Sequence, residues 1–513
     1  MKNLKLVFSI LFMIIFAISN AQNPSIEWQK CIGGSNNDYA SSIIQTSDGG
    51  YITCGTASSN DFDLIENQSG SVIFIVKLSN GGAIEWKKCI DGIGDVLSPK
   101  ITQNYRGGYT VSALKESSST NILDFNGCVL GLDSIGNVIW QKSYGGSDFD
   151  KLNSMIQTPD GGCLFVGNTS SNDGDLQNLN FFPINIGWIV KIDSIGNIEW
   201  QKLIGGSDYD ELFNVSLTSD NGYIVAGSTT SDDGDAQGNI WIECAWIIKL
   251  NSYGVIQWQK CIGRDNFNEA KDVKQCSDGG YIVACDKRPL YADDRDVFIV
   301  KLSSTGTIQW QKDLGGDRDD ILSSIFETPD GGFIVGGTVE SYSGDIPLPP
   351  YGFEDCWIVK LSSNGIIEWQ KRFGGNGSDI LYSLVQTNDN GLIFAGSTTS
   401  RSNDVIGFHT TGSYPFYIDM WIVKLSPNVF VNQYNIEETM NIFPNPTSNI
   451  INIQTETKYF GETYQIISIL GQVVAKGTIN SENMKIDISG LGKGVYILEI
   501  GNIKTTRQKF IRN

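Results

Sequence analysis

The chain has little of what catalysis and metal binding most often use. It contains one histidine, His409, which argues against a His-rich metal site and against Ser-His-Asp chemistry of a known pattern. Its place in a long loop of the last repeat favours an incidental residue over a catalytic one. The ten cysteines show no paired Cys-x-x-Cys spacing of the kind found at zinc sites. We therefore expect neither histidine chemistry nor a zinc centre.

Positive charge is also scarce. The chain has 37 Lys and Arg against 57 Asp and Glu, which gives a net charge of −20. Such a chain repels nucleic acids and anionic lipids, and no basic patch stands out to overcome the repulsion. We expect no nucleic-acid partner, and the simplest role of the charge is to keep the protein dissolved.

Long apolar runs are missing except at the start. Lys2 and Lys5 precede an apolar run from Leu6 to Ile18, and small residues follow it. This order predicts a secretory signal peptide cut between Ala21 and Gln22. The run is shorter than the roughly 20 residues that cross a bilayer, and no cysteine follows the cut to carry a lipid. We expect no transmembrane segment.

Three phrases recur seven times along the rest of the chain. The first is Ile-Glu-Trp-Gln-Lys or a close variant, and neighbouring copies lie 52 to 60 residues apart. The second is aromatic-Ile-Val-Lys-Leu, and the third is an Asp-Gly-Gly turn or a variant. The tryptophans of the first phrase are Trp28, Trp86, Trp140, Trp200, Trp258, Trp310 and Trp369.

Each repeat has the pattern of four short strands. Apolar and polar residues alternate with a period of two, and glycine occupies the tight turns, where a positive φ is needed. Four strands in roughly 50 residues are typical of a β-propeller blade, nearest in length to kelch-type repeats. The fourth-strand tryptophans should pack between neighbouring blades.

The two ends of the repeat array complete one another. The array starts with an isolated fourth strand, Ile26–Lys30, and its last blade stops after a third strand, Trp421–Leu425. Pairing of these two strands would close the ring and remove an exposed sheet edge. We expect an all-β, seven-bladed propeller, with these boundaries: signal peptide 1–21, propeller 22–425, linker 426–439 and a C-terminal β-sandwich 440–513.

One face of this ring should carry the chemically varied loops, since the tight turns lie on the other face. Acidic residues and exposed rings gather in those loops. The acidic candidates could hold Ca²⁺, although no complete calcium loop is present and turn-forming aspartate is the favoured interpretation. The rings could bind sugar or protein, or pack against the blades. The ligand-binding candidates are Asp173, Asp175, Asp232, Asp233, Asp235, Phe181, Phe182, Tyr342, Tyr351, Tyr414, Phe416 and Tyr417.

One pair of cysteines fits a disulfide. Counting outward from the turn at Asn251–Gly254, with Leu250 facing Val255, places Cys244 opposite Cys261. We predict a bridge between these two, and small buried side chains at the other cysteines.

The last seventy-odd residues have a different character. They contain Phe443-Pro444-Asn445-Pro446, Ile469-Leu470-Gly471, Leu491–Tyr496 and Lys509-Phe510-Ile511. In order and position these segments resemble the type A C-terminal sorting domain of the type IX secretion system of Bacteroidetes. The resemblance implies recognition by that machinery, passage across the outer membrane, and either attachment to the cell surface or release.

Three functions remain open from the sequence. We favour a secreted or surface-exposed, non-enzymatic module that binds glycan or protein through the varied face, and we expect a monomer without a cofactor. A propeller-fold glycosidase or lyase using acidic residues is the alternative, because two carboxylates suffice for glycoside hydrolysis. A purely structural or adhesive surface protein is the third.

Overall fold

A computed structural model describes residues 24–512. The gaps are residues 68–69, 92–95, 117–124, 178–184, 241, 264–266, 289–293, 347–350, 410–416, 428–439, 456–459, 469–472 and 501–505. The predicted signal peptide, its cut between Ala21 and Gln22, and most of the predicted linker lie outside the described residues. The chain divides into two compact units, Ala21–Val431 and a C-terminal unit that contains Asn432–Asn513.

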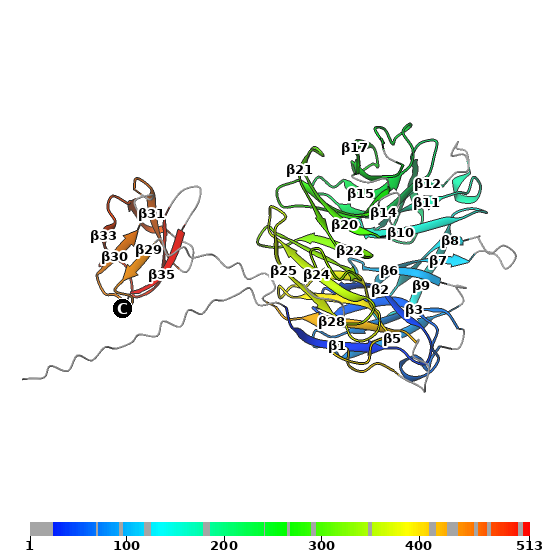
Figure 1. The fold of residues 1–513 in the computed structure, drawn as a ribbon, viewed down its shortest axis with the longest axis horizontal. Coiled ribbons are helices and arrows are strands. Elements are labelled where there is room, and N and C mark those ends of the chain that lie inside the picture. Colours follow the sequence, from blue (N-terminus) through cyan, green and yellow to red (C-terminus); the bar gives the residue numbers. More distant parts are fainter. Residues whose placement is uncertain are drawn as a thin grey trace, which may run out of the picture. The chain divides into compact units, whose positions relative to one another are not determined.

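Seven four-stranded antiparallel sheets, the blades, make up the first unit (Figure 1). Blades 1 to 3 are β2 (Asp38–Gln45), β3 (Tyr51–Ala57), β4 (Val72–Leu78), β5 (Ile84–Ile90); β6 (Val96–Gln103), β7 (Tyr109–Glu116), β8 (Phe125–Leu132), β9 (Val138–Tyr144); β10 (Asp150–Gln157), β11 (Cys163–Thr169), β12 (Ile186–Ile192), β13 (Ile198–Ile204). Blades 4 to 6 are β14 (Asp210–Leu217), β15 (Tyr223–Thr229), β16 (Cys244–Leu250), β17 (Ile256–Ile262); β18 (Phe267–Gln275), β19 (Tyr281–Arg288), β20 (Asp296–Leu302), β21 (Ile308–Leu314); β22 (Asp320–Glu327), β23 (Phe333–Val339), β24 (Asp355–Leu361), β25 (Ile367–Phe373). Blade 7 is β26 (Asp379–Gln386), β27 (Leu392–Thr398), β28 (Asp419–Leu425) and β1 (Ile26–Ile32). Two short 3₁₀ helices, η1 (Phe62–Leu64) and η2 (Gly174–Leu176), lie in the loops after β3 and β11.

The first strand of each blade is innermost, because first strands of neighbouring blades contact one another around the ring. The tight Asp-Gly-Gly turns and the turns between third and fourth strands lie on one face. The opposite face carries the connections from blade to blade and the loops between second and third strands. The predicted assignment of the two faces is therefore correct.

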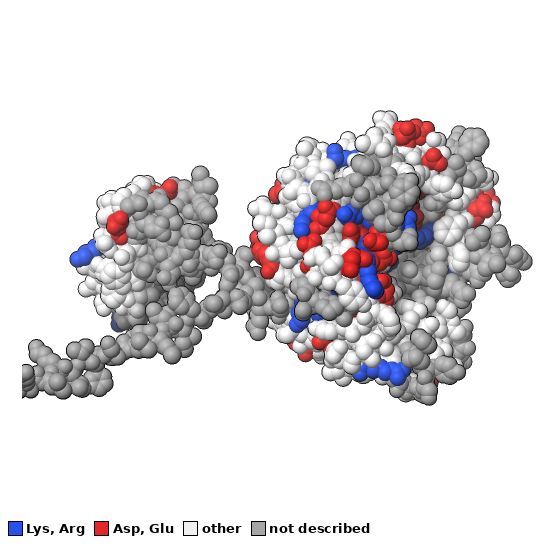
Figure 2. Space-filling view, viewed as in Figure 1, with Lys and Arg blue, Asp and Glu red and all other residues white. Residues whose placement is uncertain are grey.

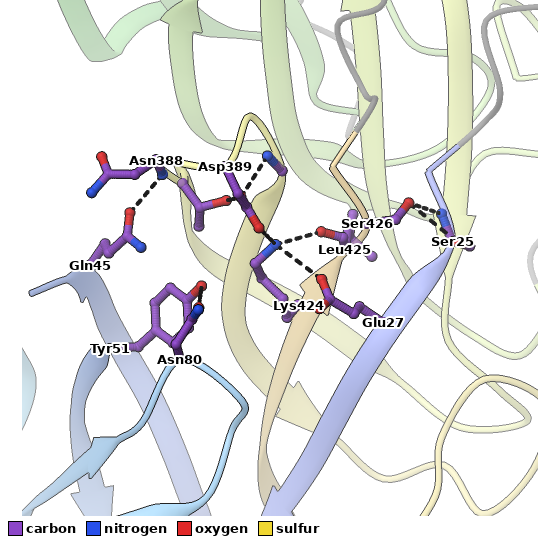
Figure 3. A network of polar contacts seen from close by, with 12 residues as sticks. Ser25, Glu27, Gln45, Tyr51, Asn80, Asn388, Asp389, Lys424, Leu425 and Ser426 are labelled. Carbon is purple, nitrogen blue, oxygen red and sulfur yellow. Dashed lines mark hydrogen bonds and ion pairs between the residues drawn. The ribbon is translucent and has the colours of Figure 1, made fainter. Parts of the chain in front are cut away.

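The N-terminal strand closes the ring. β1 pairs antiparallel with β28, from Ile26 opposite Leu425 to Ile32 opposite Met420 (Figure 1). Outside the strand ends, the amide of Ser426 donates to the carbonyl of Ser25 at 2.8 Å. Figure 3 shows a second link at this point, where the amide and the hydroxyl of Ser25 both donate to the hydroxyl of Ser426 at 3.2 Å, beside the side chain of Lys424. Blade 7 is thus completed by a segment almost 400 residues away in the chain, as the sequence predicts.

A buried lysine explains why the three phrases recur together. In six blades the lysine of the aromatic-Ile-Val-Lys-Leu phrase, here the blade lysine, is at most 6 % exposed and lies 2.8–3.1 Å from the aspartate of the Asp-Gly-Gly turn. It also donates to the carbonyl of the next residue, and in most blades to the Glu or Gln before the fourth-strand tryptophan. Each buried ammonium is thereby paired, as burial of a charge requires. The blade lysines are Lys77, Lys191, Lys249, Lys301, Lys360 and Lys424.

The fourth-strand tryptophans pack between blades, as predicted. The indole of Trp28 lies over Gly82 in the turn between β4 and β5, and its ring centroid is 5.8 Å from that of Tyr51 in blade 1. Gly82 has a φ of 79°, and a Cβ there would come within 2.7 Å of the Trp28 ring. Turn geometry and close packing therefore both require glycine at this position.

The predicted disulfide pair meets, but in a different register. A disulfide joins Cys244 and Cys261, whose Cα atoms are 5.6 Å apart. Cys261 lies opposite Trp246 rather than Cys244. The count from the turn was wrong because Leu250 faces Ile256 and a bulge follows between Lys249 and Leu250, so the bond runs diagonally across the strand pair. The other eight cysteines have free thiols, and most are buried.

The C-terminal unit is a two-sheet sandwich. One sheet contains β29 (Met440–Phe443), β30 (Ile450–Thr455) and β33 (Asn483–Asp487), and the other contains β31 (Thr463–Ser468), β32 (Val473–Thr478), β34 (Gly494–Ile500) and β35 (Thr506–Arg512). Side chains from both sheets form one buried core that includes Ile453, Tyr496 and Phe510. The predicted sandwich is confirmed, with β29 as a strand that the sequence interpretation missed.

Candidate functional site

Four of the five acidic loop candidates accept hydrogen bonds from backbone amides of the propeller. The Asp173 carboxylate accepts a hydrogen bond from the amide of Ser147 at 2.7 Å, and Asp175 accepts one from the amide of Gly145 at 3.1 Å. Blade 4 repeats both contacts, with Asp233 on the Ser207 amide and Asp235 on the Gly205 amide. These four residues join the loop between second and third strands to the connection that enters their own blade. Their arrangement supports the turn-forming interpretation.

The remaining candidates are not brought together. Asp232 is exposed, and Tyr342 and Tyr351 are exposed near the guanidinium groups of Arg318 and Arg372. Tyr417 is half-buried just before β28. Phe181, Phe182, Tyr414 and Phe416 lie outside the described residues. Among the described residues, no group of three or more His, Cys, Asp or Glu side chains is arranged to hold a metal ion.

A pocket that the sequence did not indicate opens on the varied face. Its volume is about 630 Å³, and it lies where the inner parts of blades 7, 1 and 2 meet. Seven lining residues carry hydroxyl groups, three are aromatic, and one is a lysine. The lining residues are Tyr39, Ala40, Ser41, Thr56, Ser58, Ser71, Ser98, Lys100, Phe125 and Tyr382.

Two tyrosines from different ends of the chain form one side of this pocket. Tyr39 is in β2 and Tyr382 is in β26, and both are half-buried. Burial raises the pKa of both phenols, with the negative charge of Asp38 adding to the effect on Tyr39. Both therefore stay protonated at neutral pH and can donate a hydrogen bond as well as offer a ring face.

Blade 2 departs from the other blades at this pocket. Its first strand begins with Val96, where five other blades have a buried aspartate, and it has Ser98 where the others have a buried Ala or Leu. Ser98 is exposed and has a φ of 46°, a backbone conformation that a residue other than glycine adopts only when its surroundings require it. A small polar residue in place of a core aliphatic one leaves room for the pocket.

The innermost strands surround a central channel. Across this channel from the pocket, charged side chains of the inner strands form ion pairs with one another. Figure 2 shows acidic and basic residues mixed near the centre of the face in view. In the inner strands of blades 3 to 5, Lys151 lies 3.1 Å from Glu211, and Lys271 lies 2.7 Å from Glu269. The Lys271 ammonium also lies over the ring of Phe213. These charges neutralise one another, whereas Lys100 of the pocket forms no ion pair within the described part of the chain.

His409 is a structural residue at the seam between blades 7 and 1. Its Nδ1 lies 2.9 Å from the buried Asp419 carboxylate, and its Nε2 lies 3.4 Å from the carboxylate of Asp63. The backbone amide of His409 donates to the same Asp419 oxygen. Two blades are thus joined through one side chain, a structural contact that the sequence interpretation of His409 as an incidental residue did not anticipate.

Several aspartates are buried at strand starts on the varied face. Burial raises the pKa of Asp320, Asp355 and Asp419 to about 6, although hydrogen bonds from neighbouring groups oppose the shift. Oδ1 of Asp355 and of Asp419 is buried and has no hydrogen-bond partner. An unpartnered carboxylate oxygen is least costly when the group is protonated.

The raised pKa values predict that the folded state becomes more stable as the pH falls from about 7.5 to about 5. A carboxyl whose folded-state pKa is raised binds more protons in the folded than in the unfolded chain, so stability decreases as the pH rises through this window. The gain should be on the order of 1 kcal/mol for each of the three groups. Denaturant unfolding at a series of pH values measures it.

Asp355→Asn should flatten this pH profile, and Asp232→Asn, an exposed loop substitution, should leave it unchanged. The aspartates bound to the blade lysines act in the opposite sense, because their pKa values are lowered, as for Asp48 and Asp220, to about 2. Their contribution is lost only below about pH 4. A stability that rises steadily from pH 5 to pH 8 would contradict the prediction.

Comparison with known proteins identifies the C-terminal unit. Residues 441–513 match the family described as "Secretion system C-terminal sorting domain". The segments that carried the resemblance help build its core: Phe510 stacks on Tyr496, and the Tyr496 hydroxyl donates to the carbonyl of Gly492. The protein is therefore exported to the cell surface or the extracellular medium, and this domain implies interaction with the secretion machinery.

Three solved structures, one of them described as a β-propeller, are similar to most of the chain. A protein of unknown function from Dyadobacter fermentans is 11% identical, with a TM-score of 0.42, over 79% of this chain and 100% of that one. The β-propeller domain of the Trilobed protease from Pyrococcus furiosus is 11% identical, with a TM-score of 0.40, over 79% of this chain and 99% of that one. An α-L-arabinofuranosidase from Fusarium graminearum is 10% identical, with a TM-score of 0.40, over 80% of this chain and 99% of that one. These distant likenesses indicate nothing about ligand or reaction.

No protein with a curated description matches the sequence. Within the described part of the chain, no helix is long and apolar enough to cross a membrane.

Proposed function

We propose that the propeller is a non-enzymatic, glycan-binding module of an exported protein, and that the pocket between blades 7, 1 and 2 is its binding site. The observation that carries this proposal is the lining itself. The rings of Tyr39, Phe125 and Tyr382 supply flat apolar surface for the faces of a sugar ring, and the surrounding hydroxyls match sugar hydroxyls.

The enzymatic alternative has less support at this site. Glycoside hydrolysis needs two carboxyl groups on either side of the scissile bond. The described lining contains hydroxyls, rings and an ammonium group, and four of the five acidic loop candidates accept hydrogen bonds from backbone amides. Calcium binding by those loops remains a prediction, as do the kelch-like character of the repeat, the cut after Ala21 and a monomeric mature protein.

The test is to incubate the mature protein with a panel of bacterial, algal and plant polysaccharides and to measure retention and product together. Binding without new reducing ends is expected. Tyr39→Ala and Tyr382→Ala should each weaken binding by roughly tenfold, since a ring stacked on a ligand contributes about 1–2 kcal/mol. Tyr342→Ala, which removes an exposed tyrosine away from the pocket lining, is the matched control.

New reducing ends would establish an enzyme instead. Failure of every glycan to bind would favour the structural or adhesive role. Binding that is lost in Tyr342→Ala but kept in Tyr39→Ala would place the site in the loops rather than in the pocket.

A further inference from the structure

Lys100 occupies a position that no other blade gives to a lysine. It lies in β6 opposite Ser112 of β7, and the equivalent position in the other six first strands holds a small polar or acidic residue. Those six residues are Ser42, Ser154, Asn214, Asp272, Ser324 and Ser383.

Several of these equivalent residues connect their blade to the next one through a hydrogen bond. The hydroxyl of Ser383 accepts a hydrogen bond from the amide of Ile43 at 3.2 Å, and that of Ser324 accepts one from the amide of Leu384 at 3.2 Å. Asp272 accepts one from the amide of Ile325 at 2.9 Å. An ammonium group has no lone pair and cannot accept such a bond. Lys100 therefore cannot serve the structural purpose of this position.

The ammonium of Lys100 is also incompletely satisfied. Its Nζ donates to the carbonyl of Ser41 at 3.3 Å, and within the described part of the chain it forms no ion pair. The other three lysines of the inner strands are each paired with a carboxylate: Lys151 with Glu211, Lys271 with Glu269, and Lys274 with Asp272. Burial lowers the pKa of Lys100, and the nearby Cys54 and Asp272 oppose this shift without outweighing it. The Asp272 carboxylate is itself paired with Lys274 at 2.6 Å, so the charge of Lys100 is only partly compensated.

We propose that Lys100 binds an acidic group of the saccharide, so that the ligand is an anionic sugar bearing a carboxylate or a sulfate ester. This inference rests on the proposed function and adds the chemical class of the ligand. A partly desolvated ammonium forms a charge-assisted hydrogen bond with such a group, while Tyr39 and Tyr382 contact the sugar ring. The net charge of −20 opposes a long polyanion, which limits the pocket to one charged sugar or a short oligosaccharide.

The experiment uses calorimetric titration of the mature protein with matched oligosaccharides. One series compares galacturonate oligomers with their methyl esters, and a second compares a sulfated oligosaccharide with its desulfated form. The wild type should prefer at least one acidic form over its neutral partner by roughly tenfold or more, as expected for a hydrogen bond to a charged group. The series in which the preference appears distinguishes carboxylate from sulfate.

Lys100→Met should abolish the preference without weakening the neutral ligand, and Lys100→Arg should retain part of it. Lys151→Met, which removes a paired lysine of the inner strands, should leave the preference intact. Thermal melts of all variants exclude misfolding. Equal binding of acidic and neutral forms, or an unchanged preference in Lys100→Met, would overturn the inference while leaving glycan binding in place. Absence of any saccharide binding would overturn the proposed function itself, and with it this inference.

Discussion

A chain that begins at Gly33, and so lacks β1, is expected to lose most of the stability of the propeller. β1 supplies the outer strand of blade 7, where Ile32 is fully buried and Ile26, Trp28 and Cys31 pack on neighbouring core residues. Loss of this burial should cost on the order of 5 kcal/mol. The whole stability of a folded domain is about 5–15 kcal/mol.

The truncation also exposes the edge of β28. An unpaired edge is a template for pairing with another chain, so the truncated protein should associate or aggregate, as seen by size-exclusion chromatography beside thermal unfolding. A peptide of residues 24–33 added in trans should restore the melting temperature, because it can add to that edge as a strand. A control peptide with Trp28→Asp and Ile32→Asp should not. A truncated chain that melts at the temperature of the full propeller would contradict strand closure.

The fold could be predicted because the same pattern of strands and turns recurs seven times in the sequence. The repeat array begins with an isolated fourth strand and lacks a fourth strand at its end, so the simplest arrangement pairs the two ends. β1 pairs with β28 accordingly. The register of the third and fourth strands was harder. A bulge recurs beside the turn, as between Lys249 and Leu250, and a bulge leaves no plain signal in an alternating sequence.

The sequence interpretation missed the pocket, which is the proposed site, for a related reason. Asp173 and Asp175 attracted attention as a cluster, yet the same pair recurs as Asp61 and Asp63 in blade 1. Recurrence at a fixed phase of the repeat indicates a structural role. The useful signal was the opposite one: residues 96–100 break the pattern that the other blades share.

The sequence could not show that Tyr39 and Tyr382 line the same pocket. They are more than 340 residues apart and become neighbours only because blade 7 lies beside blade 1. Each also sits in a strand whose alternation shows which residues face inward, without showing what they face across the channel.

Lys360→Met is expected to be the most destabilising substitution among the blade lysines. The Lys360 ammonium is 3.1 Å from the carboxylate of Asp330, and the two side chains are only 2 % and 7 % exposed. Removing one partner of a buried pair leaves an uncompensated charge, which costs about 3–5 kcal/mol. Lys249→Met is the matched control, because its partner Asp220 is 51 % exposed and can be hydrated, so the cost there should be about 1 kcal/mol.

The pH dependence of this loss tests its electrostatic origin. Burial acts to raise the pKa of Asp330, and the bonds from Thr328, Gly332 and Lys360 outweigh it, so the pKa lies below the usual value. This carboxylate therefore stabilises the wild type above about pH 4, and its contribution is lost as the pH falls through its folded-state pKa. Without Lys360 the uncompensated burial should raise the pKa of Asp330, so that the variant gains stability on acidification.

The difference in unfolding free energy between wild type and Lys360→Met should accordingly be large at pH 7.5 and shrink towards pH 4.5, as measured by denaturant unfolding. Adding Asp330→Asn should recover much of the loss at pH 7.5, because it removes the charge that Lys360 compensates. A loss that is the same at both pH values, and is not reduced in the double variant, would mean that Lys360 stabilises the blade through the packing of its methylene groups rather than through its charge.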